Sequence, residues 1–333
     1  MTWVIWRQHR QQAIVALAGL GAFVAFFALT GPAMSHTYHA SGLAACIAAR
    51  SDCGSLLNAF DAKYNAFQVI VPLFLVLPAL VGVFWGAPLI ARELERGTFR
   101  LAWTQSVSRR HWAIAKLTSI GGAVLALGAA FAALVTWWSL VLTITHTDRF
   151  VPGIFDLRGL APIGYMLFAI ALGIFLGHLI GKVLPAMGAT LAGFTAVRFV
   201  ITVFVRKHYM PAKTSVATMG VPKFNDGPRG AWVLSRAVLD RAGHIISHEG
   251  GIDFQYLSSR CPNIPSPKSA FAVPVGGKDP IISCVTRLGL RSLTTFQPAN
   301  RYWTFQWIEF AIYAVLAFGL LGFVVWRVSR SPR

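Results

Sequence analysis

Residues 92–116 read RELERGTFRLAWTQSVSRRHWAIAK, and this polar segment decides how the rest of the chain is interpreted. It contains six Lys and Arg residues and separates two strongly apolar runs, residues 67–90 and 113–145. Short loops rich in Lys and Arg stay on the cytoplasmic side when the segments beside them cross a membrane. The segment is therefore predicted to be a cytoplasmic connector between two membrane spans.

The composition also indicates a membrane protein. Of the 333 residues, 55% are hydrophobic and only 13% are charged, and the mean hydropathy is +0.58. The formal charge of +18 would suggest nucleic-acid binding only if the basic residues were concentrated on one face of a soluble domain. Here they lie between apolar runs, so membrane topology accounts for them and no nucleic-acid partner is expected.

Six apolar runs each provide the roughly 20 helical residues that a bilayer requires. They are residues 12–32, 67–90, 113–145, 161–182, 183–205 and 303–326. Only Gly181, Lys182 and Pro185 mark the boundary between the fourth and fifth runs. This predicts either a tight hairpin or a broken pair in which residues 183–205 do not cross fully.

The first eleven residues, MTWVIWRQHRQ, combine tryptophan with arginine. Trp3 and Trp6 are one helical turn apart, with Arg7 and Arg10 beside them, which favours a short helix lying in the headgroup layer. The alternative is the first turns of a long span with interfacial tryptophans. No cleavage site follows the first apolar run, so that run is expected to remain as an anchor.

The distribution of Lys and Arg predicts the orientation of the chain. Twelve lie in residues 1–11, 91–116, around 182 and in 327–333, whereas four lie in residues 33–66 and 146–160. This bias places both termini in the cytoplasm and predicts a multi-pass protein of the cell (plasma) membrane. The long segment 206–302 has thirteen, but long translocated segments do not follow this rule.

The predicted fold is an all-α integral membrane protein in three parts. Residues 1–205 form spans 1–5, residues 206–302 form an extracytoplasmic domain, and residues 303–333 form span 6 and a cytoplasmic tail. The extracytoplasmic segment is rich in Pro, Gly and Ser with short apolar patches, which favours a small mixed α/β or irregular fold.

All four cysteines fall in segments predicted to lie outside the cell. They are Cys46, Cys53, Cys261 and Cys284. An even number of cysteines in an oxidising compartment predicts two disulfides, for which three connectivities are possible. The local pairs Cys46–Cys53 and Cys261–Cys284 are favoured, with four free cysteines as the alternative.

The connector contains signals for a short helix of its own. Gly97 can end the preceding span, Thr98 can cap a helix from Phe99 to about Gln105, and Ser108 can cap the third span. Phosphate-binding loops of the form GxxxxGK[ST], HExxH sequences and GxSxG sequences are absent from the chain. The chain itself is therefore not expected to be an enzyme.

The connector carries the pattern E-x-x-x-G-T, then S-R and a closing lysine, as Glu93, Gly97, Thr98, Ser108, Arg109 and Lys116. This pattern resembles the signature of ATP-binding-cassette (ABC) type-2 permeases with the type V fold. Together with WVIWRQHR near the start and FQPANRYWTFQWIE before the last span, it is similar to membrane subunits of actinobacterial ABC exporters.

The resemblance implies a coupling helix that contacts a separate ATPase subunit. It assigns this role to Glu93, Glu95, Gly97, Thr98, Phe99, Arg100, Trp103, Ser108, Arg109 and Lys116. It implies two ATPase subunits, a second copy of the chain or a paralogous permease, and surrounding membrane lipid as partners. No cofactor is expected in this chain, because ATP and Mg would bind to the ATPase.

Two intramembrane charges of opposite sign are expected at similar depth. Glu309 lies six residues into the last span and Arg198 lies seven residues before the end of the fifth, so both are roughly 10 Å from the outer boundary. A charge inside a membrane is costly, so an Arg198–Glu309 ion pair is predicted. The alternative is that each side chain reaches outer water separately.

Residues of the second, fourth and fifth spans suggest close packing and a substrate path. Gly82 and Gly86 in the second span, and Gly173, Gly177 and Gly181 in and after the fourth, form small-xxx-small patterns. Pro72, Pro78 and Pro88 are expected to kink the second span. The resemblance implies a path lined by the second and fifth spans, for which Phe74, Phe84 and Phe194 are candidates. An aromatic path suits a hydrophobic or amphipathic cargo.

Two other functions are compatible with parts of the sequence. A secondary transporter driven by an ion gradient would use Glu309, with His178 as a second proton carrier. A membrane-embedded transferase would need polar residues that converge at one face. His244, His248 and Glu249 have the spacing of a weak metal motif but no marked third ligand, so no metal site is expected.

Overall fold

The computed structural model describes residues 2–49, 51, 53–96, 109–139, 149–219, 230–248, 251–261 and 280–330. The chain divides into two compact units. The first, called the helical unit, comprises Met1–His146, Pro152–Ile201 and Gln306–Arg333. The second, called the mixed unit, comprises Thr147–Val151 and Thr202–Phe305. The mixed unit thus includes the whole of the predicted extracytoplasmic segment 206–302.

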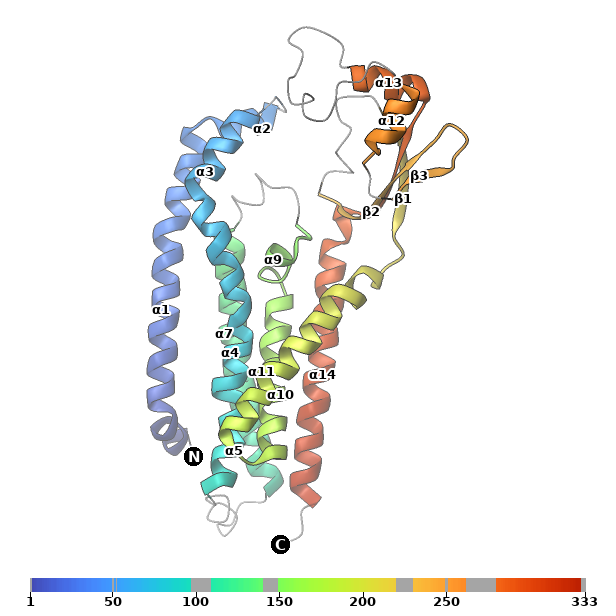
Figure 1. Cartoon of the computed structure of the whole chain (residues 1–333). Helices are drawn as coiled ribbons and strands as arrows, with labels where there is room; N and C mark the ends of the chain where they lie inside the picture. Colours follow the sequence, from blue (N-terminus) through green and yellow to red (C-terminus); the bar gives the residue numbers. More distant parts are fainter. Residues whose placement is uncertain are drawn as a thin grey trace. The chain divides into compact units, whose positions relative to one another are not determined.

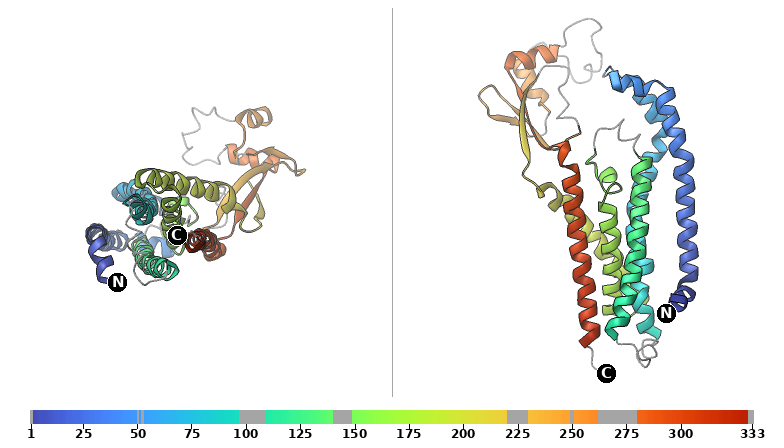
Figure 2. Two further views of the ribbon diagram at one scale, coloured as in Figure 1. Left: turned by 90° about the horizontal axis from the view of Figure 1, so that it is seen from below. Right: turned by 180° about the vertical axis from the view of Figure 1, so that it is seen from behind.

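The helical unit is built from long helices that run alongside one another (Figures 1 and 2). Its helices are α1 (Thr2–Ala40), α2 (Leu43–Ala49), α3 (Gly54–Ile70), α4 (Leu77–Val81), α5 (Ala87–Arg96), α7 (Arg109–Trp138), α9 (Pro152–Phe155), α10 (Ala161–Ile180), α11 (Val183–Val200) and, from Gln306 onward, α14 (Tyr302–Arg330). The start of α1, the end of α5, the α10–α11 turn and the end of α14 all lie at its lower end in Figure 1.

Five helical stretches in the described part of the chain are long and apolar enough to cross a membrane. They are Leu73–Glu95, Ile120–Trp138, Ala161–Ile180, Val183–His208 and Ala299–Arg330. These agree with five of the six predicted spans, and the first predicted span, residues 12–32, lies within α1 but is not among them. Residues 2–11 continue into α1 without a break, so the separate interfacial helix is not seen and the alternative, a long first helix, fits better.

The second span changes helix type along its length. A 3-10 helix at Val71–Val76 precedes α4, and a π-helix at Gly82–Gly86 follows it before α5 begins. Pro72 lies in the 3-10 part and Pro78 lies in α4, where each lacks the amide hydrogen that a regular helix would use. The prolines therefore mark a span that is irregular, as the sequence indicates.

Glycines allow this irregular span to approach α10 closely. A Cβ atom on Gly86 would lie 2.7 Å from the Ile170 carbonyl oxygen, and one on Gly173 would lie 2.7 Å from the Ala87 amide nitrogen. Gly82 faces the Ala169 backbone in the same way. Real Cβ atoms do not come this close to backbone, so the small-xxx-small pattern marks a true helix–helix contact.

The turn between α10 and α11 is a tight hairpin. Gly181 adopts a left-handed conformation, with φ of 68°, and donates its N–H to the Gly177 carbonyl oxygen at 3.0 Å. A residue with a Cβ atom rarely adopts this conformation, so glycine ends α10 here. The stretch Val183–His208 contains 26 residues, enough for a full span, which favours the hairpin over the broken pair.

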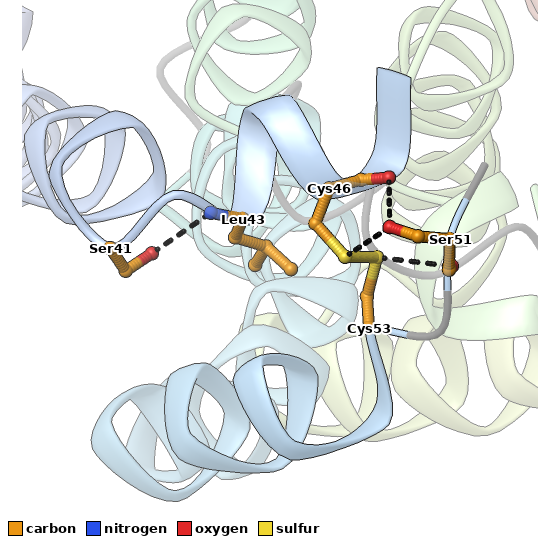
Figure 3. Close-up of a disulfide and its surroundings, with 5 residues drawn as sticks. All are labelled: Ser41, Leu43, Cys46, Ser51 and Cys53. Carbon is orange, nitrogen blue, oxygen red and sulfur yellow. Dashed lines mark hydrogen bonds between the residues drawn. A yellow bond between two sulfur atoms is a disulfide. The ribbon is translucent and has the colours of Figure 1, made fainter. Parts of the chain in front are cut away.

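The upper part of α1 packs with α2 and α3 and carries the first cysteine pair. At 39 residues, α1 is about 58 Å long, well beyond the ~30 Å hydrocarbon core. The Tyr64 hydroxyl on α3 donates to Thr37 Oγ1 at 2.8 Å. Cys46 and Cys53 are bonded, and Ser51 Oγ donates to the Cys46 carbonyl oxygen at 3.2 Å (Figure 3).

The mixed unit contains a four-stranded antiparallel sheet, so the all-α prediction is wrong for this part of the chain. The strands are β1 (Lys213–Thr218), β2 (Trp232–Leu239), β3 (Ile245–Ser247) and β4 (Arg291–Gln297), in the order β1-β4-β2-β3. The helices α12 (Phe254–Arg260) and α13 (Pro280–Leu288) accompany them. The sheet explains the short apolar patches of the segment, and the mixed α/β expectation for it is correct.

The core of the mixed unit gathers apolar side chains from the sheet and both helices. Its buried members are Met219, Val238, Leu257, Val285 and Leu290. Cys261, next to α12, is bonded to Cys284 on α13, so both favoured cysteine pairs are brought together. Phe150, Trp232 and Phe305 form a second, aromatic cluster in this unit, with Phe150 stacked on Trp232 at a centroid separation of 5.9 Å.

The turn that joins β2 to β3 depends on the charge of Asp240. The His244 backbone N–H donates to Asp240 Oδ1 at 2.8 Å, and this hydrogen bond, followed by the His244 ring, lowers the pKa of the Asp240 carboxyl below its ordinary value. Because the folded-state pKa is lowered, the stabilisation is complete above the ordinary Asp pKa of about 4 and is lost as the pH falls through the lowered value.

We expect amide hydrogen exchange in the turn Asp240–His244 to become faster, relative to the intrinsic rate, between pH 6 and pH 3. The variant Asp240→Asn keeps an oxygen acceptor but cannot titrate, so its protection should not depend on pH. Equal protection of the wild-type turn at both pH values would contradict the role given to Asp240.

Candidate functional site

The predicted coupling residues lie at the lower end of the helical unit or outside the described residues. Gly97, Thr98, Phe99, Arg100, Trp103 and Ser108 are outside the described part of the chain. Glu93 and Glu95 lie in the last turns of α5, and Arg109 and Lys116 lie in the first turns of α7. The connector therefore starts at the end of α5 and finishes at the start of α7, and both points lie at the lower end of the helical unit (Figure 1).

Glu95 connects the end of α5 to the beginning of α11. The Val183 backbone N–H donates to Glu95 Oε2 at 3.2 Å. Val183 is the first residue of α11, and its N–H has no partner within its own helix. A carboxylate at this position satisfies the N–H and interacts favourably with the positive end of the helix dipole. One predicted coupling residue therefore contacts another span directly.

Small side chains bring α5 close to the α10–α11 turn. Ala87 and Ala91 on α5 and Ala186 on α11 are fully buried against one another. Ile180, Val183 and Met187 pack around them. Alanine allows two helices to approach closely and leaves little space for sliding, so movement of α5 is expected to carry the beginning of α11 with it.

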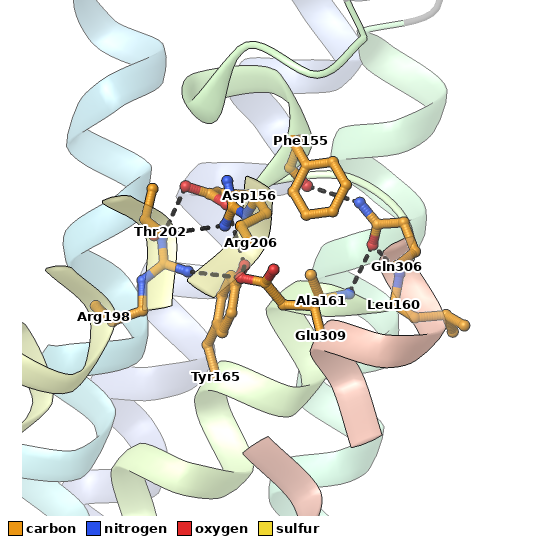
Figure 4. Close-up of polar contacts among 10 residues, drawn as sticks. All are labelled: Phe155, Asp156, Leu160, Ala161, Tyr165, Arg198, Thr202, Arg206, Gln306 and Glu309. Atoms are coloured by element: carbon orange, nitrogen blue, oxygen red, sulfur yellow. Dashed lines mark hydrogen bonds and ion pairs between the residues drawn. The ribbon is translucent and has the colours of Figure 1, made fainter. Parts of the chain in front are cut away.

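A second polar site lies inside the helical unit, near the start of α10 and the end of α11, away from the turn that joins these helices (Figure 4). Asp156, directly after α9, accepts from Arg198 Nη2 on α11 at 2.9 Å. Arg198 Nη1 lies 3.9 Å from Glu309 Oε1 on α14. Asp156 is 3% exposed and Glu309 is fully buried. We call Asp156, Tyr165, Arg198 and Glu309 the buried charge cluster.

Tyr165 on α10 completes this cluster. Its hydroxyl lies 3.0 Å from Asp156 Oδ1 and 2.8 Å from Glu309 Oε1, so it can donate to either carboxylate. The Arg198 guanidinium carbon lies 3.7 Å from the centre of the Tyr165 ring, a cation–π distance. Four separate segments of the helical unit thus contribute to one buried polar network.

Gln306, one turn before Glu309, ties α14 to the beginning of α10. Its Oε1 accepts from the Leu160 and Ala161 backbone N–H groups at 3.0 and 2.9 Å. Its Nε2 donates to the Phe155 carbonyl oxygen at 2.9 Å. Gln306 therefore caps α10 and holds the segment that carries Asp156 (Figure 4).

The structure brings the predicted ion pair together but adds a nearer partner. Arg198 and Glu309 lie in one cluster, but Arg198 is closer to Asp156, at 2.9 Å, than to Glu309, at 3.9 Å. Sequence reasoning missed Asp156 because it placed the residue in a solvated loop. An acidic residue in the apolar sequence FDLRGLAPIGY, directly before a span, was the available signal.

The three candidate path residues are not brought together. Phe194 is only 3% exposed and stacks on Phe168 at a centroid separation of 6.1 Å. Phe74 is partly buried and packs against Phe23 on α1 at a centroid separation of 4.8 Å. Of the three, Phe84 alone is largely exposed, at 54%. Hydrophobic character did not distinguish core from surface.

No group of three His, Cys, Asp or Glu side chains suited to a metal ion occurs within the described residues. The His244 ring lies 3.3 Å from Asp240 Oδ2, so this histidine takes part in the β2–β3 turn. Glu249, the third member of the weak motif, is outside the described residues.

The candidate spans, the glycine-mediated contacts between them and the buried charge cluster define an α-helical, multi-spanning integral membrane protein. A family model described as ABC-2 membrane transporter related matches residues 17–206, more than half of the chain. The chain therefore belongs to the ABC-2 membrane transporter related family, which confirms the resemblance to type-2 permeases. No curated protein and no solved structure shows a significant match.

Proposed function

We propose that this chain is the membrane-spanning permease subunit of an ABC exporter driven by a separate ATPase. The observation that carries the proposal is the polar connector of a type-2 permease, framed by Glu95 and Arg109 at the end of the unit where α5 meets α11. Permeases of this family generally work with an ATPase subunit. Two ATPase subunits would bind ATP and Mg beneath two facing copies of the chain, or this chain and a paralogue.

In the proposed mechanism, closure of the two ATPases moves the connector between α5 and α7. The buried alanines and the Glu95–Val183 hydrogen bond transmit this movement to the beginning of α11. Because α11 is a continuous helix from Val183 to Val200, the movement reaches Arg198, about 23 Å away along its axis. There the buried charge cluster links α11 to α10 and α14.

The proposed cargo is hydrophobic or amphipathic, such as a drug, an antibiotic or a lipid-like molecule, and is moved out of the cell. Exposed aromatic and aliphatic side chains on the second and fifth spans support this class. They include Phe84, Leu184, Leu191 and Phe199. In the facing pair they would border lipid or the path between the copies. Both termini would lie in the cytoplasm.

The proposal is tested by expressing the chain with and without the product of its neighbouring gene. Co-purification of an ATPase, with vanadate-sensitive ATP hydrolysis stimulated by the permease, is the expected result. Transport by the chain alone in vesicles with an ion gradient and no ATP, abolished by Glu309→Gln, would instead establish the secondary transporter.

The contact of Glu95 predicts how coupling should respond to substitution. Glu95→Ala removes the acceptor for the Val183 N–H, so cargo-stimulated ATP hydrolysis should fall about fivefold, as expected for a lost cap worth about 1 kcal/mol. Glu95→Gln keeps an oxygen acceptor and should retain most of the stimulation. If both variants behave like the wild type in a reconstituted ATPase assay, the contact does not transmit movement.

A further inference from the structure

The mixed unit contains a pocket that the proposed transport mechanism does not use. The pocket has a volume of about 370 Å³ and is lined by Lys207, His208, Met210, Pro211, Ala212 and Leu234. A volume of this size is within the range of small-ligand sites. Lys207 and His208 are basic, whereas the other four lining residues have apolar side chains.

The basic side of the pocket offers positive charge and hydrogen-bond donors. Within the described residues, the Lys207 ammonium makes no hydrogen bond or ion pair. His208 Nδ1 lies 2.8 Å from the Phe204 carbonyl oxygen, which can only accept, so Nδ1 donates to it. In the imidazolium form Nε2 carries a hydrogen as well and can donate to an anionic ligand. An ammonium beside an imidazolium is suited to an anionic group such as phosphate.

The apolar side of the pocket is held in place by two side chains. Gln297 Nε2 donates to the Met210 carbonyl oxygen at 2.7 Å, and Arg301 Nη1 donates to the Pro211 carbonyl oxygen at 2.6 Å. Arg301 also donates to Gln297 Oε1 at 2.7 Å, and Gln297 is fully buried. The wall that carries Met210 and Pro211 is therefore fixed before any ligand binds, which favours affinity.

The position of the pocket indicates where its ligand comes from. The candidate span Val183–His208 ends at the two basic residues, so they lie where an apolar segment gives way to a polar domain. Residues 206–302 contain thirteen Lys and Arg against five Asp and Glu, so the surrounding segment attracts anions. Basic residues at the end of a span interact favourably with anionic headgroups.

We propose that this pocket binds the phosphate group of an anionic amphipathic molecule, with the phosphate on Lys207 and His208 and the apolar chain on Leu234 and Met210. This inference rests on the proposed function only in placing the mixed unit on the outer side of the membrane. A resident lipid and an exported amphipath share this chemistry. Neither transport nor the ATPase is needed to detect binding, so its failure is distinguishable from failure of the proposed function.

The test measures binding of radiolabelled dihexanoylphosphatidylglycerol to the full-length chain in detergent, by equilibrium dialysis. The double variant Lys207→Gln/His208→Gln should bind it at least about tenfold more weakly. The matched control Lys213→Gln/His248→Gln removes the same residue types from other exposed positions of the mixed unit and should bind like the wild type. Equal weakening in both double variants would show a general basic surface and overturn the proposal.

Two further measurements address folding and ligand identity. Ala212→Trp fills the pocket while retaining both basic residues, and it should weaken binding with an unchanged elution profile; unchanged binding overturns the proposal. Glycerol phosphate, which lacks the apolar chain, should compete at least about tenfold less well, and equal competition would show a free-phosphate site instead. Bound lipid that is released only when the partner ATPase hydrolyses ATP is cargo, whereas lipid that stays is resident.

Discussion

The variant Arg198→Ala should lower the free energy of unfolding by about 3–5 kcal/mol, because removing one partner of a buried ion pair leaves the other charges uncompensated. Arg198 contacts Asp156 at 2.9 Å and Glu309 at 3.9 Å, and both carboxylates are buried. The measurement is reversible unfolding of the purified chain in mixed detergent micelles. The exposed Arg149 provides the control, since Arg149→Ala should change stability by less than about 0.5 kcal/mol.

The two carboxylates should differ in their contributions. Asp156→Asn should cost about 3 kcal/mol, whereas Glu309→Gln should cost about 1 kcal/mol, because Glu309 is farther from Arg198 and its replacement can still accept from the Tyr165 hydroxyl. The charge exchange Arg198→Glu with Glu309→Arg should restore little, since the new glutamate would face Asp156. Full recovery of stability in the exchanged protein, together with no effect of Asp156→Asn, would show that Arg198 pairs with Glu309 alone.

Gly173→Ala should also be strongly destabilising, by about 2–3 kcal/mol, although it adds a single methyl group. The added Cβ would lie 2.7 Å from the Ala87 amide nitrogen and 2.9 Å from the Gly86 carbonyl carbon, and backbone cannot move aside as a side chain can. The α5–α10 contact would therefore open, and coupling through α5 should weaken with it. Unfolding in micelles and cargo-stimulated ATP hydrolysis report the two effects.

Gly188 on α11 is the matched control for this substitution. A Cβ atom on Gly188 would meet nothing within 4 Å, so Gly188→Ala should be neutral or stabilise the helix by up to about 1 kcal/mol. If Gly173→Ala is as well tolerated as Gly188→Ala, the contact between the second span and α10 is looser than the structure indicates.

The span pattern and the close helix contact could be predicted because hydrophobicity and glycine spacing are local properties of the sequence. The glycines at positions 82, 86, 173 and 177 lie at the α10 contact, and the prolines coincide with changes of helix type. Both favoured cysteine pairs also form, since short separations in the sequence restrict which cysteines can meet.

The remaining features depend on tertiary contacts that no local pattern encodes. Asp156 reaches Arg198 only because Gln306 on a distant helix holds the segment before α10. The roles of Phe74 and Phe194 could not be separated from that of Phe84, since burial of an aromatic residue depends on which helix faces it. The contact of Glu95 with Val183 joins residues from two spans and could not be predicted from the sequence either.

The central claim is that movement enters this chain through the connector of residues 92–116, from an ATPase beneath the membrane. Site-specific photo-crosslinking from Trp103, in a complex purified with the proposed ATPase partner, tests it most directly. We expect a crosslink to the ATPase whose yield changes between the ATP-bound and nucleotide-free states. A crosslink to lipid alone in both states, in a complex that still hydrolyses ATP and transports cargo, would contradict it.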